Sequence, residues 1–355
     1  MSLLFMDGFD AYATAQIVDK WTNSNQLSGS NVTIASPGRF GSGNRLDQTP
    51  TVAGNLVGIN KSLIQGPQTS LVNGFAWKYG GAAFASPGTC IWALFDSTGA
   101  ILASIFVNAA GGLEYHVGLS ATPLVSSNPG IVNVQAWGHV GLDVVLSSSA
   151  AGSVLLYFNG NQIASISSVV TAANANGCSM LGPSLYTTDT HTNPATQSYD
   201  DIYMFNKSGG VHTTFVGDCE CLSQVPNGAG HVTDFTPVGS SPNWACVNEI
   251  PPDSDTTYVE DSTVGDKDAY TNTNLTNVST VVAVQLCAFA RKDSSPARSL
   301  ALGWSNGTTD VLDAGHFLNT SYTYELSPLD QNPVSAAPWT VSDINTEQVV
   351  IQVAS

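Results

Sequence analysis

The densest group of residues that could do chemistry is an acidic segment between positions 253 and 268. Its candidate metal ligands are four aspartates, namely Asp253, Asp255, Asp266 and Asp268. Carboxylate oxygens at this density are the hard ligands that Ca²⁺ prefers, although the glycine and terminal glutamate of an EF-hand are not in place. We favour solvated acidic turns as the interpretation, with a calcium site as the alternative, and we expect no other cofactor.

Side chains arranged for catalysis are scarce. Hydrolysis by two carboxylates needs both acids on one face of a strand, which positions i and i+2 share. Glu114 is the single glutamate of residues 1–208, and its alternation partner is His116, so an acid/base pair is conceivable but a solvent-facing pair is favoured. Asp200 and Asp201 are adjacent and should therefore point to opposite faces.

Established catalytic motifs are also missing from the sequence. It contains no nucleophile elbow, zinc-protease helix, phosphate-binding loop or dinucleotide-binding turn. His139 lies two positions after Trp137, on the same face of a predicted strand, where we expect a satisfied structural histidine. The sequence therefore predicts no catalytic residues and no enzymatic activity.

The charge of the chain limits its partners. The net charge is −17, only 10% of the 355 residues are charged, and 43% are hydrophobic. A chain this acidic cannot hold a phosphate backbone by releasing counterions, and it is repelled by anionic membranes. No apolar run approaches the roughly 20 residues of a membrane span, and no signal peptide is visible. We expect no nucleic-acid partner, no membrane insertion and folding in a cytoplasm.

The elements that must position these residues are strands. Apolar or alternating runs of strand length recur between turn residues, and no long helical stripe is present. Residues 90–95, 101–107 and 113–117 predict a three-stranded meander, and Asn159-Gly160 predicts a type I′ hairpin turn. The six cysteines are too scattered for a disulfide scaffold; Cys90 and Cys287 lie in apolar runs and should be buried. We interpret Cys219 and Cys221 as structural thiols.

Four elements in order resemble a concanavalin A/laminin-G-like jelly roll over residues 1–208. They are a strand ending at Asp7-Gly8-Phe9-Asp10, a Trp-x-His-Val-x-Leu strand at 137–142, a Val-x-Leu-Tyr-x-Asn-Gly hairpin at 154–160 and an Asp-Asp-Ile-Tyr strand at 200–203. The resemblance implies two antiparallel sheets packed face to face, with Trp77, Trp92 and Trp137 in the core. It also makes exposed tyrosines candidates for glycan contacts, and these are Tyr115, Tyr186 and Tyr203.

Residues 209–355 are more acidic and resemble the C-terminal half of tailed-bacteriophage virion structural proteins. They carry seventeen acidic and four basic residues, against ten and six in residues 1–208. The resemblance rests on a Gly-Asp segment at 217–218, the segment 244–258 and the closing segment 339–345. We predict a second, smaller β-sandwich that serves as a virion-assembly domain.

Taken together, these features predict a non-enzymatic structural component of a bacteriophage particle, in the tail or its distal baseplate end. Its partners would be other virion proteins and copies of itself, and its location would be the virion after assembly in the bacterial cytoplasm. One alternative is a carbohydrate-binding host-attachment protein that binds a host surface glycan. The other is a capsid decoration protein, because nothing in the sequence separates head from tail.

Overall fold

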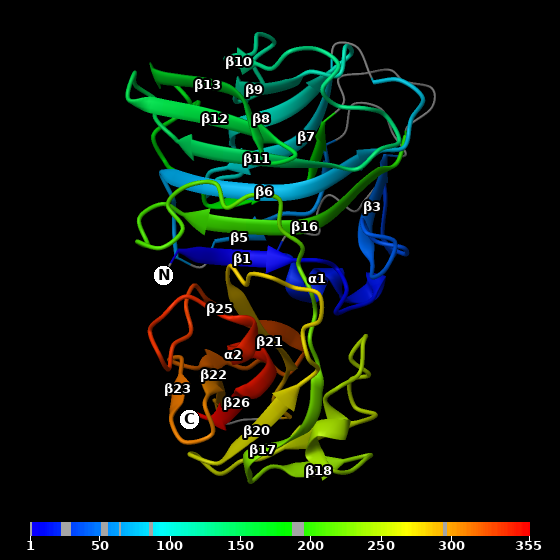
Figure 1. Ribbon diagram of the computed structural model, residues 1–355, viewed down its shortest axis with the longest axis vertical. Coiled ribbons are helices and arrows are strands. Elements are labelled where there is room, and N and C mark those ends of the chain that lie inside the picture. The colour runs from blue at the N-terminus through cyan, green and yellow to red at the C-terminus, as the bar shows by residue number, and fades with distance from the viewer. Residues whose placement is uncertain are drawn as a thin grey trace. The chain divides into compact units, whose positions relative to one another are not determined.

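The chain folds almost entirely into strands and turns, which confirms the predicted all-β class (Figure 1). The computed structural model describes residues 2–22, 30–50, 56–63, 65–84, 88–186, 195–293 and 297–355. Within these residues the α-helices are α1 (Ile17–Lys20) and α2 (Val341–Thr346). Neither is long and apolar enough to cross a membrane.

The described chain divides into two compact units. The first comprises Ser2–Asp10 and Thr14–Cys221, and the second comprises Ala11–Ala13 and Leu222–Ser355. Residues 209–221 therefore pack with the first unit, although the composition changes after residue 208. Whether the two units fold separately at the predicted boundary stays a prediction.

One sheet of the first unit has eight antiparallel strands and positions the candidate site. The order of its main path is β13 (Asn161–Val169), β12 (Gly152–Phe158), β11 (Gly138–Val145), β6 (Ser70–Tyr79), β16 (Gln197–Asn206), β3 (Arg45–Pro50) and β2 (Ser30–Ala35). The eighth strand, β1 (Leu3–Asp7), also pairs with β16. The opening and closing strands of the jelly roll are thus neighbours.

The second sheet of the first unit has six strands. Their order is β10 (Val125–Ser126), β9 (Leu113–Val117), β8 (Ile101–Asn108), β7 (Gly88–Phe95), β14 (Met180–Gly182) and β5 (Lys61–Ser62). Strands β7, β8 and β9 pair in succession, which confirms the predicted meander. A separate ladder joins β4 (Leu56–Gly58) to β15 (Ser184–Tyr186).

The core of this unit shows which face of the eight-stranded sheet is internal. The ring of Phe75 on β6 stacks on Trp92 of β7 with centroids 4.3 Å apart, and Tyr199 on β16 donates a hydrogen bond to the carbonyl of Ile91. Because alternate residues of a strand face opposite sides, Ala76 and Lys78 lie on the outer face. The cores of jelly rolls form between such paired sheets.

Two of the three tryptophans expected in the core are there. Trp77 and Trp92 are buried, but Trp137 is partly exposed, so its predicted place in the core is wrong. Trp137 immediately precedes β11 and shares the outer face with Lys78, whose ammonium lies 5.0 Å from the centre of its ring. The alternation of side chains along the strand correctly predicts that Trp137 and His139 share a face, but it does not show which face of the sheet is internal.

The Asn159-Gly160 step joins β12 to β13 as predicted. Both residues have positive φ, 48° and 79°, as a type I′ turn requires. The side chain of Asn159 also accepts a hydrogen bond of 2.8 Å from the main-chain N–H of His139 on the neighbouring strand. The turn therefore fixes the start of β11 as well as the hairpin.

The second unit is a smaller β-structure with its own core. One sheet runs in the order β17 (Pro226–Thr233), β20 (Lys267–Asn272), β26 (Gln348–Val353), β22 (Ser299–Ser305) and β23 (Asp310–Leu312), and β24 (His316–Phe317) also pairs with β22. Two further ladders join β18 (Thr236–Val238) to β19 (Tyr258–Glu260) and β21 (Val284–Ala290) to β25 (Thr323–Leu329). Trp304 and Trp339 pack edge to face within its core.

The cysteines are free thiols, and one prediction about them is wrong. Cys90 is buried as expected, whereas Cys287 is exposed. The side chain of the preceding residue, Leu286, packs into the core of the second unit. Because neighbouring residues of a strand alternate between faces, Cys287 points away from that core.

Candidate functional site

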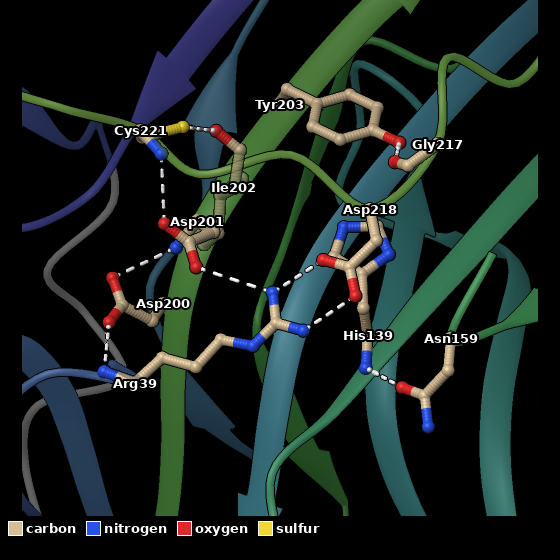
Figure 2. A network of polar contacts seen from close by, with 10 residues as sticks. All are labelled: Arg39, His139, Asn159, Asp200, Asp201, Ile202, Tyr203, Gly217, Asp218 and Cys221. Carbon is tan, nitrogen blue, oxygen red and sulfur yellow. Dashed lines mark hydrogen bonds and ion pairs between the residues drawn. The ribbon is translucent and has the colours of Figure 1, made fainter. Parts of the chain in front are cut away.

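A connected group of polar side chains lies on the outer face of the eight-stranded sheet (Figure 2). The register pairs Ala76 of β6 with His139 of β11 on one side and with Asp200 of β16 on the other. Directly paired residues of neighbouring strands share a face. A cross-strand row thus places an imidazole and a carboxyl group on either side of a small alanine side chain.

A β-bulge brings two adjacent carboxylates together. The register of β16 against β6 shifts between Asp200 and Tyr203, and Asp201 adopts a left-handed φ of 51°. A bulge adds a residue to one strand and breaks the alternation of its side chains. Asp200 accepts a hydrogen bond of 2.8 Å from the main-chain N–H of Arg39, and Asp201 lies 3.5 Å from the guanidinium of the same residue. The prediction that the two aspartates serve opposite faces is therefore wrong.

Arg39 connects this pair to the segment that follows β16. Its guanidinium donates two hydrogen bonds, of 2.5 and 2.6 Å, to the two carboxylate oxygens of Asp218. Burial alone would raise the pKa of Asp218, but the hydrogen bonds from Arg39 and the charge interactions with His139 and Arg39 together outweigh it, and the pKa is lowered. The two parallel hydrogen bonds from the planar guanidinium of Arg39 therefore stabilise Asp218 as a carboxylate, and this bidentate geometry is the one in which arginine recognises acids.

The two bulge carboxylates are held closer to their neutral forms. Burial, followed by the negative charge of Asp201, raises the pKa of Asp200 to about 8. Burial also raises the pKa of Asp201, to about 6, although its hydrogen bond from the N–H of Cys221 and the charge of Arg39 oppose the change. The pKa of Asp200 is therefore the more strongly raised of the two. Strongly shifted carboxyl groups of this kind often mark functional sites.

His139 is the polar group of this face that has the fewest partners. Its side chain is 0% exposed, and its ring lies 5.8 Å from that of Tyr203 and 6.0 Å from that of Phe215. Neither ring nitrogen has a hydrogen-bond partner among the described residues. Burial lowers its pKa to about 4, so the imidazole is neutral at pH 7. The described residues therefore do not supply the hydrogen bonds expected of a satisfied structural histidine.

A second cross-strand row, beside the first, begins at Trp137. Lys78 lies against the Trp137 ring and pairs in register with Ser198 of β16, which pairs in turn with Asp47 of β3. Ser198 donates a hydrogen bond of 2.6 Å to Asp47, and Arg45 donates two, of 2.9 and 3.0 Å, to the same carboxylate. The row combines a partly exposed aromatic ring with hydroxyl, ammonium, carboxylate and guanidinium groups.

Basic residues gather around this face. Four of the six basic residues of 1–208 belong to it: Arg39, Arg45, Lys78 and Lys207, the last bonded to Asp143 of β11. The other two, Lys20 and Lys61, are buried elsewhere in the unit. No described carboxylate forms an ion pair with Lys78. Its ammonium group instead lies against the ring of Trp137.

The structure does not gather the tyrosines that were expected to bind glycan. Tyr115 is buried and its hydroxyl donates to the carbonyl of Thr171, while Tyr203 is buried and donates to that of Gly217. Tyr186 lies in β15, and its side chain is outside the described part of the structure. An open aromatic platform at Tyr115 or Tyr203 is therefore ruled out. The sequence analysis named Trp137 but placed it in the core, because the pattern within one strand does not report which face of the sheet is internal.

The four aspartates proposed as calcium ligands have separate partners. Asp268 is buried and accepts hydrogen bonds from the main chain of Phe235 and the side chains of Asn243 and Tyr270. Asp255 pairs with Arg291 at 2.8 Å, and Asp253 accepts two hydrogen bonds from Thr257. Asp266 lies in the turn before β20. In the described ranges no group of three or more His, Cys, Asp and Glu residues is placed to hold a metal ion, and the calcium site stays a prediction.

The pair formed by Glu114 and His116 does share a face, as alternation predicted. The Nε2 atom of His116 lies 3.1 Å from a carboxylate oxygen of Glu114, whose other oxygen accepts a hydrogen bond from Asn108. The Nδ1 atom of His116 lies 2.7 Å from the carbonyl oxygen of Ser120. Glu114 and His116 lie on β9 and Asn108 lies on β8 of the six-stranded sheet, so the pair is separate from the network around Arg39.

No protein-family model matches the chain, and no curated protein matches its sequence. Several solved structures are similar to it over about the length of the first unit. An endo-β-1,4-glucuronan lyase from the fungus Trichoderma reesei is 15% identical, with a TM-score of 0.43, over 57% of this chain and 94% of that one. The alginate lyase Aly36B is 12% identical, with a TM-score of 0.38, over 56% and 95%. The catalytic domain of a GH131 β-glucanase from Podospora anserina is 13% identical, with a TM-score of 0.38, over 57% and 95%.

These comparisons correct one expectation and leave another without support. The prediction that the chain is not an enzyme is contradicted, because the similar structures are polysaccharide lyases and a glucanase. At such low identities and TM-scores the likeness does not carry their chemistry over to this chain. The comparisons lend no support to a place in a bacteriophage particle.

Proposed function

We propose that the first unit binds a glycan on the outer face of its eight-stranded sheet, at the row that begins with Trp137. The observation that carries the proposal is the pairing of a partly exposed Trp137 ring with the ammonium group of Lys78, 5.0 Å from its centre. A sugar ring presents C–H groups on its faces and hydroxyls at its rim. An exposed aromatic ring flanked by hydrogen-bonding side chains is complementary to both.

The remaining residues of the row supply fixed polar contacts. Arg45 and Ser198 hold the carboxylate of Asp47 by three hydrogen bonds. A side chain restrained in this way loses little conformational entropy when it binds a ligand. The row crosses β6, β16 and β3, so it would contact an extended oligosaccharide rather than a single sugar. The similar structures include a glucuronan lyase, an alginate lyase and a β-glucanase, and the proposal agrees with that class of ligand but rests on the residues of this chain.

The test measures the affinity of the whole chain for a panel of neutral and acidic polysaccharides. Trp137→Ala should weaken binding about fivefold, since an aromatic stacking contact contributes roughly 1 kcal/mol. Phe317→Ala removes a side chain that is 77% exposed in the second unit and serves as the control. Equal affinity of the wild type and Trp137→Ala would refute the proposal, as would an equal loss in the control.

A second candidate function is a structural role in a bacteriophage particle, in which glycan binding would serve attachment to the host. The basis for this role is the sequence resemblance of residues 209–355, whose closing segment folds within the second unit. Trp339 is buried in its core, and Thr340 and Asp343 form a capping box at the start of α2. Mass spectrometry of purified particles tests this role, and particles that lack the chain would exclude it.

A further inference from the structure

Residues 213–219, here called the cover segment, lie over part of the same outer face. The ring of Phe215 stacks on Tyr157 of β12 with centroids 4.2 Å apart and planes 19° apart. Beneath it lies Gly141 of β11, where an added Cβ atom would come within 2.2 Å of the Phe215 ring. The glycine therefore leaves a place on the sheet that the Phe215 ring fills.

The cover segment is attached through few polar contacts. Asp218 binds the guanidinium of Arg39, and the carbonyl of Gly217 accepts a hydrogen bond of 2.6 Å from Tyr203 (Figure 2). Just beyond the segment, the N–H of Cys221 bonds to Asp201. No residue of the segment belongs to a strand or helix, and none is fully buried. Segments with few buried contacts are the ones that open most readily.

His139 provides independent evidence that the part of the outer face covered by Phe215 could bind a ligand. Its buried ring nitrogens have no hydrogen-bond partner among the described residues, and Phe215 and Tyr203 are the aromatic rings beside it. A buried polar group without a partner costs about 1–3 kcal/mol. An aromatic side chain such as Phe215 cannot provide the missing hydrogen bond, whereas a sugar hydroxyl in the same place could.

The place that Phe215 covers lies on the same face as the proposed glycan site and is reached from Trp137 along β11, roughly at right angles to the cross-strand row. Trp137 and Gly141 are four residues apart along one extended segment, which corresponds to about 13 Å. His139 lies between them and faces the same side. An oligosaccharide that begins at Trp137 and follows β11 would therefore reach His139 and then the position of the Phe215 ring.

We propose that the cover segment occupies a second subsite for the glycan and must move aside when the subsite is filled by a sugar that carries a carboxylate. In this arrangement the sugar ring replaces Phe215 on Tyr157, a hydroxyl bonds to His139, and the carboxylate replaces that of Asp218 on Arg39. We infer that the sugar carries a carboxylate because the guanidinium of Arg39 now binds a carboxylate, that of Asp218, through two hydrogen bonds. This inference deepens the proposed function and rests on it.

The cover segment should compete with the ligand. An aromatic pair is worth about 0.5–1.5 kcal/mol beyond its buried area, so loss of the Phe215 ring should favour the ligand by up to about tenfold. Loss of the Asp218 carboxylate should act in the same direction, because it frees Arg39. Val211 is 38% exposed and lies just before the segment, so Val211→Ala is a matched control.

Calorimetric titration of the whole chain tests the proposal with an alginate tetrasaccharide as the acidic probe and cellotetraose as the neutral one. Phe215→Ala and Asp218→Asn should each bind the acidic probe several-fold to tenfold more tightly than the wild type. Val211→Ala should bind like the wild type. Adding His139→Phe to Phe215→Ala should abolish the gain. Affinities of Phe215→Ala and Asp218→Asn that equal or fall below that of the wild type would overturn the proposal.

Two further measurements separate this proposal from the proposed function. If Trp137→Ala leaves binding intact while Phe215→Ala strengthens it, the site at Trp137 is wrong and the covered subsite stands. If Trp137→Ala weakens binding while Phe215→Ala and Asp218→Asn bind like the wild type, the site at Trp137 stands and the covered subsite is wrong. Hydrogen exchange of amides 213–219 should become faster in the wild type when the acidic probe is added, and slower exchange would contradict the displacement. Binding of neither probe by any variant would reject both proposals.

Discussion

The main-chain N–H of Asp201 donates a hydrogen bond of 2.9 Å to the carboxyl group of Asp200, its immediate neighbour in the chain. The bulge in β16 makes this contact possible and places both side chains beside Arg39. Two carboxyl groups that are buried together cannot both ionise easily. Their environment therefore links the stability of the first unit to pH.

Asp200→Asn should stabilise the protein relative to the wild type as the pH rises. The folded pKa of about 8 lies above the ordinary 3.8, so the folded state holds a proton that the unfolded chain releases. The free energy of unfolding of the wild type should accordingly fall between about pH 4 and pH 8. The variant lacks this titration, and its advantage should grow by on the order of 2–4 kcal/mol across the window. Denaturant unfolding at several pH values measures it, and a constant difference would contradict the prediction.

His139→Phe should raise the free energy of unfolding by about 1 kcal/mol at pH 7, because it removes two buried nitrogens without described partners. The folded pKa of about 4 lies below the ordinary 6.5, so the wild type should lose stability as the pH falls from about 6.5 to about 4. The variant should not share this loss. Destabilisation by His139→Phe at pH 7 would show that the imidazole has a partner, such as an ordered water molecule.

Arg39→Lys should destabilise the first unit by about 1 kcal/mol. A lysine keeps the charge but cannot reproduce the two parallel hydrogen bonds to Asp218. The matched control is Arg291→Lys, because Arg291 pairs with Asp255, whose side chain is 64% exposed in the second unit. Exposed pairs contribute little, so the control should change stability by less than about 0.5 kcal/mol. Thermal unfolding compares them, and equal effects would show that the Arg39 contact is only a surface pair.

A fragment that ends at residue 221 should be more stable than one that ends at residue 208, by about 2 kcal/mol. The shorter fragment loses the stack of Phe215 on Tyr157 and the hydrogen bond from Cys221 to Asp201. It also leaves Arg39 without Asp218. Both fragments would be compared by urea unfolding. Equal stability would place the end of the first unit at residue 208, where the change in composition predicted it.

The sequence alone was enough to predict the all-β class, the meander of β7, β8 and β9, and the type I′ turn at Asn159-Gly160. These features follow from local rules. Alternation reports a strand, and an Asn-Gly step accepts positive φ at low cost. The same rules correctly placed Glu114 and His116 on one face.

Only the tertiary structure decided which residues make up the candidate site. Alternation assigned Asp200 and Asp201 to opposite faces, because a bulge depends on how a strand pairs with its neighbours and leaves no local signature. Trp137 could not be distinguished from the core tryptophans, because its face is set by the sheet that packs against β11. The stack of Phe215 on Tyr157 joins residues 58 positions apart, and the fork of Asp218 on Arg39 joins residues 179 positions apart. Contacts of that range arise from the folded arrangement of the sheet, so no pattern within a single segment of the chain can report them.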